Sequence, residues 1–149
     1  MKNNYKPTDR ESRSLGAYVK LMRAAESVTV RVHGNLAGTG LTVSQFGVLE
    51  ALYNIGPMTQ KEVGAKILKS SGNITMVIDN LEKRGLVKRT RSSEDRRAFV
   101  VSLTNDGYAL IDDIFPEHAR VITRELGVLS IKEQVELARL CKKLGLSLG

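Results

Sequence analysis

The chain has 149 residues, 42% of them hydrophobic, which suits one folded domain with helical extensions and excludes a disordered protein. Its net charge of +7 favours an anionic partner, either nucleic acid or an acidic membrane surface. The single cysteine, Cys141, excludes an intrachain disulfide framework and a cysteine zinc cluster, and it fits a reducing compartment.

The N-terminal residues are polar without an apolar signal segment, and no apolar run approaches the length of a membrane span. We therefore expect a cytoplasmic protein without a membrane contact. After a lead-in of about ten residues, apolar side chains keep helical spacing from Leu15 to Leu36, which predicts a long first helix. Thr42 and Gln45 form a capping box that opens a second helix, and the Gly-Pro pair at 56 and 57 ends it. The inward residues of this helix are Phe46, Leu49, Leu52 and Tyr53.

A second capping box, Thr59 with Glu62, predicts a short third helix with Val63, Ile67 and Leu68 apolar. A tight connection leads into a fourth helix. Its apolar residues recur at i, i+3, i+4 and i+7, on one stripe that faces a core: Ile74, Val77, Ile78 and Leu81. Gly85 is a natural left-handed stop after this helix.

Beyond Gly85 the pattern becomes that of two strands, beginning near Leu86 and Ala98, with a polar tip over residues 92–97. From Lys83 to Arg97 there are seven basic and two acidic residues, a net +5 of the +7 total. Because this charge lies mainly on a hairpin and not on an amphipathic helix, nucleic acid is favoured over a membrane as the partner.

Thr104 is a plausible N-cap for a fifth helix, which we expect to be interrupted or kinked at Pro116. A third capping box, Ser130 with Glu133, opens the last helix. Cys141 falls on the apolar side of that helix, where a buried, inert thiol is the default expectation.

This order of elements predicts a mainly α fold with a small β-hairpin wing: a winged helix-turn-helix with N- and C-terminal dimerisation helices. The predicted domains are a dimerisation helix (1–40), the winged helix-turn-helix DNA-binding domain (41–104) and C-terminal dimerisation helices (105–149). A homodimer would cover the apolar terminal helices and match a pseudo-palindromic operator in double-stranded DNA. An intramolecular helical cap is the alternative.

The outer face of the fourth helix carries short polar side chains that suit base reading, although such a face is often merely solvated. Arg96 and Arg97 at the tip suit the minor groove, and Lys88, Arg89 and Arg91 suit phosphates. Asp79 is placed to orient Lys83 at i+4. Together with the resemblance given next, which implies Ser71 and Asp95, the predicted DNA-contacting residues are Ser70, Ser71, Asn73, Thr75, Met76, Asn80, Lys83, Arg89, Arg91, Asp95, Arg96 and Arg97.

The chain resembles the MarR family of transcription regulators in three segments: LTVSQFGVLEAL (41–52), SSGNITMVIDNLEKRGLVKR (70–89) and SSEDRRAFVVSLTNDGYALI (92–111). The resemblance implies a dimeric repressor with intertwined terminal helices. It also implies that Asp95 pairs with Arg97 to hold the wing towards the minor groove. Its base-facing residues would be Ser71, Asn73, Thr75 and Met76.

The resemblance further implies a pocket between the dimer helices and the winged domain, where a small aromatic ligand weakens DNA binding. Residues 45–63, 70–87 and 112–118 look most like regulators that respond to quinones and related aromatic compounds. The candidate pocket walls are Tyr18, Met22, Phe46 and Tyr53, with Arg23 or His33 as the partner of an anionic ligand. All of these are equally typical of ordinary core or surface residues.

An alternative interpretation is a protein-interaction module whose basic hairpin binds an acidic partner, and competition by duplex DNA would separate the two. The sequence contains no nucleophile motif, no cluster of histidines with carboxylates and no phosphate-binding glycine loop. We therefore predict no enzymatic activity, cofactor or metal site. His33 and His118 are expected to have surface or packing roles.

Overall fold

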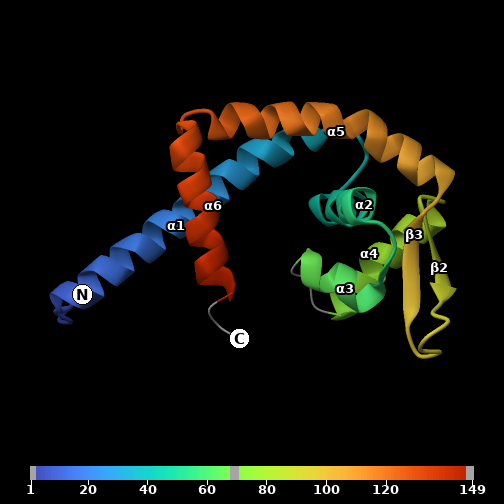
Figure 1. Ribbon diagram of the computed structural model, residues 1–149, viewed down its shortest axis with the longest axis horizontal. Helices are drawn as coiled ribbons and strands as arrows, with labels where there is room; N and C mark the ends of the chain where they lie inside the picture. The colour runs from blue at the N-terminus through green and yellow to red at the C-terminus, as the bar shows by residue number, and fades with distance from the viewer. Residues whose placement is uncertain (1–2, 68–70, 147–149) are drawn as a thin grey trace. The chain divides into compact units, whose positions relative to one another are not determined.

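The computed structural model describes residues 3–67 and 71–146, with Ser71 and Gly72 described at the backbone only (Figure 1). The chain is mainly helical, with one small sheet. In order, its elements are α1 (Asp9–His33), the 3-10 turn η1 (Gly34–Leu36), α2 (Val43–Ile55), β1 (Met58–Thr59), α3 (Gln60–Lys66), α4 (Ser71–Lys83), β2 (Val87–Arg91), β3 (Phe99–Leu103), α5 (Asn105–Leu126) and α6 (Ile131–Leu146). The predicted fold class is confirmed.

The chain divides into two compact units. The central unit is Asn35–Thr123, and the terminal unit combines Met1–Gly34 with Arg124–Gly149. Most of α5 therefore belongs with the winged elements, whereas the sequence-based division assigned the whole helix to the terminal extensions.

Side-chain caps fix where the helices begin. The boxes at Thr42, Thr59 and Ser130 are all formed, with each hydroxyl accepting from a backbone N–H three residues on. A fourth box at Thr8, closed by Glu11, starts α1 inside the segment predicted to be a lead-in. Local chemistry alone is thus sufficient to set these four starts.

The core of the central unit gathers one apolar face from each surrounding element. Phe46 and Leu49 of α2 are buried, as is Ile111 of α5. The predicted stripe of α4 is confirmed: Ile74, Ile78 and Leu81 are at most 2% exposed, and Val77 packs against the core from its edge. Burying this stripe fixes which face of α4 is turned to solvent.

The wing is part of a three-stranded antiparallel sheet of order β1-β3-β2. β2 and β3 form the predicted hairpin, with Val87 opposite Leu103 and Arg91 opposite Phe99. β1 pairs with β3 through Met58 and was not predicted, because two residues are too short to show strand alternation.

Pro116 lies inside α5, which runs as one helix from Asn105 to Leu126. The helix is not interrupted at Pro116, because neighbouring turns hold it across the missing proline N–H, and a kink at this residue stays a prediction. Gly85 follows α4 with φ of 71°, as expected for a left-handed stop.

α6 buries none of its described residues, so Cys141 is exposed instead of buried as predicted. No helix in the described parts of the chain combines the length and the apolar character that a membrane crossing requires.

Candidate nucleic-acid interface

Three edges of α4 have different surroundings. The core edge was described above. An outward stripe carries side chains that are all exposed and that recur at i, i+3, i+7 and i+10: Asn73, Met76, Asn80 and Lys83. Met76 is 61% exposed. The stripe combines two short amide side chains and one lysine with the flexible apolar side chain of Met76. Such a surface can approach the edges of bases.

The third edge, Thr75, Asp79 and Glu82, faces protein groups. Thr75 is half-buried, and its hydroxyl accepts from Gln60 Nε2 at 2.8 Å. Asp79 pairs with Arg89 of β2 rather than with Lys83, so the predicted i+4 pair is wrong. The reason is geometric: residues 75, 79 and 82 lie one above another on the side of α4 that meets α3 and β2.

Arg89 joins this edge to the wing. Its Nη2 pairs with Asp79 and lies 3.3 Å from Glu82 Oε1, and its Nη1 donates to Gln60 Oε1 at 3.3 Å. The backbone N–H of Arg89 also donates to Glu82 Oε2 at 3.1 Å. Partial burial lowers the pKa of Arg89, but hydrogen bonds and attraction to Glu82 and Asp79 outweigh it and raise the pKa overall. We call Gln60, Thr75, Asp79, Glu82 and Arg89 the Arg89 cluster.

Hydrogen bonds between residues close in the sequence shape the wing tip. Ser92 Oγ accepts from the N–H groups of Glu94 and Asp95 at 3.2 and 3.3 Å. The resemblance implied that Asp95 pairs with Arg97, and in the structure Asp95 Oδ1 accepts from the backbone N–H of Arg97 at 2.9 Å. Asp95 thus builds the turn, because a short carboxylate readily bonds the backbone two residues on. Arg96 and Arg97 are left exposed at the tip.

Two further cations contact protein groups. Arg91 Nη1 donates to the Arg96 carbonyl at 2.7 Å, and its guanidinium lies 5.2 Å from the centre of the Phe99 ring. Arg84 Nη1 donates to the Gly40 carbonyl at 2.8 Å. Lys88 is exposed on β2. Some cationic side chains of the hairpin and of the end of α4 therefore contact protein groups, and others face solvent.

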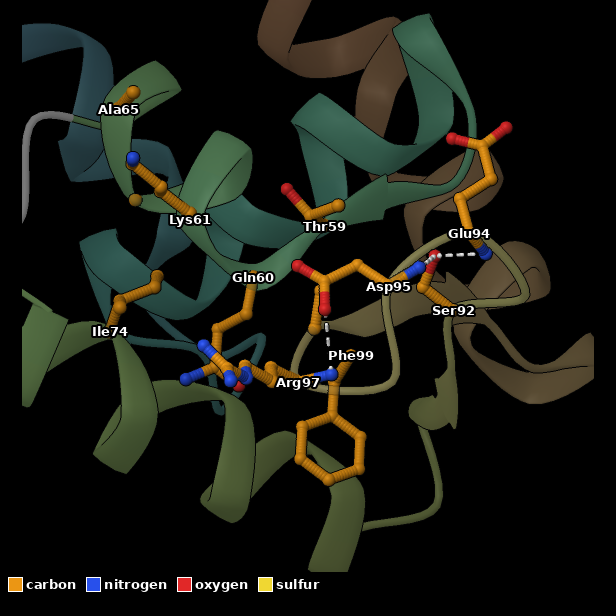
Figure 2. A pocket seen from close by; sticks show the side chains of 12 residues that line it. Thr59, Gln60, Lys61, Ala65, Ile74, Ser92, Glu94, Asp95, Arg97 and Phe99 are labelled. Carbon is orange, nitrogen blue, oxygen red and sulfur yellow. Dashed lines mark hydrogen bonds between the residues drawn. The ribbon is translucent and has the colours of Figure 1, made fainter.

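A cavity of about 830 Å³ separates α3 and the start of α4 from the wing tip. Figure 2 shows the Arg97 side chain directed back from the tip towards Gln60 and Ile74. Lys61 and Arg97 contribute positive charge to the lining, and Glu94 and Asp95 contribute negative charge. The charges of the cavity wall balance, so the cavity does not select an anion.

The predicted aromatic pocket residues lie in both units. Phe46 is a core residue with its ring centre 4.5 Å from that of His118, which is itself buried. Tyr53 donates its hydroxyl to Asp112 Oδ1 at 2.6 Å, and this hydrogen bond raises the pKa of Tyr53. Tyr18 and Met22 are exposed on α1, in the terminal unit.

Of the remaining predicted contacts, Ser70 lies outside the described residues, and the side chain of Ser71 is likewise not described. Within residues 3–67 and 71–146 no three histidine, cysteine or acidic side chains are grouped as a metal site. Gln60 and Glu82 were missed by sequence reasoning, because neither the helical period nor a motif indicates a contact with a strand that follows in the chain.

Comparisons with known proteins agree with this architecture. The model of the MarR family matches residues 39–98. The HTH-type transcriptional regulator MhqR of Bacillus subtilis (strain 168) is 37% identical over 135 residues, which cover 91% of this chain and 93% of MhqR.

Two solved structures are also similar to this chain. AbsC, a MarR family transcriptional regulator from Streptomyces coelicolor, has a TM-score of 0.82 at 22% identity and covers 97% of this chain and 98% of its own. BpsR of Bordetella bronchiseptica has a TM-score of 0.77 at 27% identity, covering 87% of this chain and 98% of its own. The extensive match to MhqR, together with the winged helix-turn-helix, shows that this chain belongs to the MarR family of transcriptional regulators.

Proposed function

We propose that the protein is a dimeric, sequence-specific DNA-binding repressor whose binding is weakened by a small aromatic ligand. The observation that carries the proposal is the exposed stripe of α4 beside a wing whose tip exposes Arg96 and Arg97. The stripe would enter the major groove, where Asn73 and Asn80 read base edges and Met76 contacts a thymine methyl. The two arginines would enter the adjoining minor groove.

A dimer is proposed because apolar side chains on both terminal helices are exposed in the single chain. Leu15, Tyr18 and Met22 recur at i, i+3 and i+7 on α1, and each is at least 50% exposed. A comparable stripe on α6 carries Leu137, Leu140 and Leu144. Patches of this kind mark protein contacts, and a second copy covers both while pairing two α4 stripes with a pseudo-palindrome.

The proposed effector is a phenol, a quinone or an aromatic acid. DNA binding by the similar protein BpsR is regulated by 6-hydroxynicotinic acid, which is an aromatic acid. Within the central unit we propose Tyr53 as a wall of the ligand pocket, whereas Phe46 is a buried core residue and Tyr18 and Met22 lie in the terminal unit. Tyr53 is half-buried, and its ring centre lies 5.5 Å from that of Tyr108 and 5.4 Å from that of Phe115, which together offer an apolar, aromatic surface to such a ligand.

DNA reading is tested by fluorescence anisotropy with the full-length protein, its own upstream DNA and a scrambled duplex, across a salt series. Preferential binding to the upstream DNA that weakens steeply with salt supports the proposal. Equal, weak binding to both duplexes leads to a selection from genomic fragments. Failure of that selection to enrich any sequence contradicts the proposal and favours an acidic protein as the partner of the hairpin.

The ligand is tested on the protein–DNA complex with 6-hydroxynicotinic acid, a simple phenol and a benzoquinone. At least one should lower operator affinity, while cyclohexanecarboxylic acid, which has the charge without the aromatic ring, should not. If none of the three changes affinity at millimolar concentration, the aromatic-effector part of the proposal fails and DNA reading is unaffected.

A further inference from the structure

Arg89 joins the wing, α3 and α4 through charged and polar side chains. It comes from β2, while its partners Asp79 and Glu82 come from α4 and Gln60 from α3. Gln60 in turn donates to Thr75 near the start of α4. The contacts on α4 therefore extend over two turns, from residue 75 to residue 82. Asp79 and Glu82 contact the Arg89 guanidinium directly, and Thr75 is connected to it through Gln60.

The charge of Arg89 is already neutralised within the protein. One guanidinium meets two carboxylates, so this group carries a net charge of −1. The Arg89 side chain is only 20% exposed, whereas both acidic partners are 42% exposed. A phosphate approaching Arg89 would meet Asp79 and Glu82 first, and repulsion from them would offset any attraction to the guanidinium.

Arg89 occupies a position in the hairpin from which its contacts can influence the direction of the wing. Arg89 lies opposite Val101, near the middle of the β2–β3 register, and the tip begins at Ser92. β1 adds pairing only at Val100 and Val101 of β3. Beyond this pairing lies the outer part of the hairpin, which carries Arg96 and Arg97, and Arg89 links β2 to α4 three residues before the tip begins.

We propose that Arg89 is a positioning residue that fixes the angle between the wing and the outward stripe of α4, and that it makes no phosphate contact of its own. This inference rests on the proposed function, since it concerns how the two DNA-contacting elements are held in register. The planar fork of arginine is required, because two carboxylates and an amide oxygen surround it in fixed directions.

Arg89→Lys tests the assignment without changing the charge of the protein. A lysine would serve a phosphate almost as well, but its single ammonium cannot replace the fork. We expect about tenfold or greater loss of affinity for the operator, with affinity for a scrambled duplex and the salt dependence unchanged. The matched control is Lys88→Gln on the same strand, which should weaken binding to both duplexes alike and reduce the salt slope by about 1.

Asp79→Asn distinguishes positioning from simple electrostatics. Removing a negative charge from a DNA-binding domain should tighten binding to every duplex if charge alone matters. If Asp79 holds Arg89 in place, operator affinity should fall instead, again by about tenfold, and discrimination against the scrambled duplex should shrink. Tighter binding by Asp79→Asn, or unchanged operator binding by Arg89→Lys, overturns the inference.

A readout without DNA separates this inference from the proposed function. In a Cys141→Ser background, spin labels placed at Ser93 in the wing tip and Asn54 on α2 report the direction of the wing within the central unit. Excess unlabelled protein suppresses signals between copies. Arg89→Lys should broaden the distance distribution, and an unchanged distribution in a folded variant contradicts the inference. Failure of the wild-type protein to discriminate between duplexes would contradict only the proposed function.

Discussion

Gly107 shows how a single backbone contact can require one residue type. A Cβ built at this position would lie 1.9 Å from the carbonyl oxygen of Leu86. The same oxygen accepts from the N–H of Thr104 at 3.1 Å, so it cannot easily move away. The glycine in the T-x-x-G segment at 104–107 therefore allows the start of α5 to lie directly against the strand-turn junction after α4.

Gly107→Ala should destabilise the protein by about 3 kcal/mol, because either α5 or the Leu86 peptide must shift. Urea denaturation followed by circular dichroism measures the change. Gly16→Ala in α1 is the control, since the added Cβ meets only a lysine Nζ at 3.9 Å. That substitution should stabilise the protein by about 0.5–1 kcal/mol. Equal effects at the two positions would contradict the steric argument.

Arg97 is the residue on which the proposed minor-groove contact depends most directly. Arg97→Ala should preserve folding and lower operator affinity by about 1–3 kcal/mol, with a salt slope reduced by about 1. Anisotropy titrations at several salt concentrations give both quantities. Arg120→Ala removes the same charge from α5, where Arg120 pairs with Glu117, and should leave binding unchanged. If both variants bind like the wild type, Arg97 has no part in the contact.

At the scale of elements, the sequence predicted what local rules determine. The period of apolar residues located the buried edge of α4, and hydroxyl–carboxamide or hydroxyl–carboxylate pairs located the starts of α2, α3 and α6. Gly85 correctly marked the end of the α4 segment. These features involve residues within one or two turns of each other, so a single sequence contains the information.

Elements defined by distant partners were not predictable in this way. β1 exists because Met58 meets Val101, and Asp79 pairs with Arg89 because β2 returns along α4. The expected phosphate role of Arg89 followed from its place in a basic run, whereas its surroundings depend on two helices and a strand. Composition located the charged region, but only the tertiary arrangement shows which cations already have protein partners.

Thr104 links the turn after α4 to the first turn of α5 through one hydroxyl. Its Oγ1 donates to the Gly85 carbonyl at 2.6 Å and accepts from the Gly107 N–H at 3.0 Å. Thr104→Val keeps the shape of the side chain but loses both hydrogen bonds, so we expect a loss of about 1–2 kcal/mol in urea denaturation. Thr90→Val, the same change at an exposed position of β2, should have little effect. A loss of similar size at Thr90 would show that the hydroxyl bonds of Thr104 are not the cause.

At the scale of the whole molecule, the apolar surface of the terminal helices predicts how copies associate. Leu140 is 47% exposed, at the centre of the α6 stripe. Leu140→Glu should shift the protein from dimer to monomer in sedimentation equilibrium, since a carboxylate in an apolar interface costs several kcal/mol. Operator affinity should fall with it.

Lys142→Glu is the matched control for that shift, because it makes a larger change of charge on the side of the same helix opposite the leucine stripe. This variant should sediment like the wild type. A wild-type protein that sediments as a monomer at micromolar concentration would contradict the dimer directly.

The cations held by protein groups have a further consequence for the cell. Between Lys83 and Arg97, a fully described segment, two carboxylates neutralise Arg89, whereas Arg84 and Arg91 each donate to a backbone carbonyl and keep their charge. Counting only the exposed Lys83, Lys88, Arg96 and Arg97 gives four phosphate contacts for each copy. Two copies would then displace about seven counterions from the operator, so a doubling of intracellular potassium would weaken binding by about a hundredfold. If the protein is the repressor proposed above, an osmotic upshift would weaken its operator binding without any ligand, and its target genes would respond to water loss as well as to an aromatic compound.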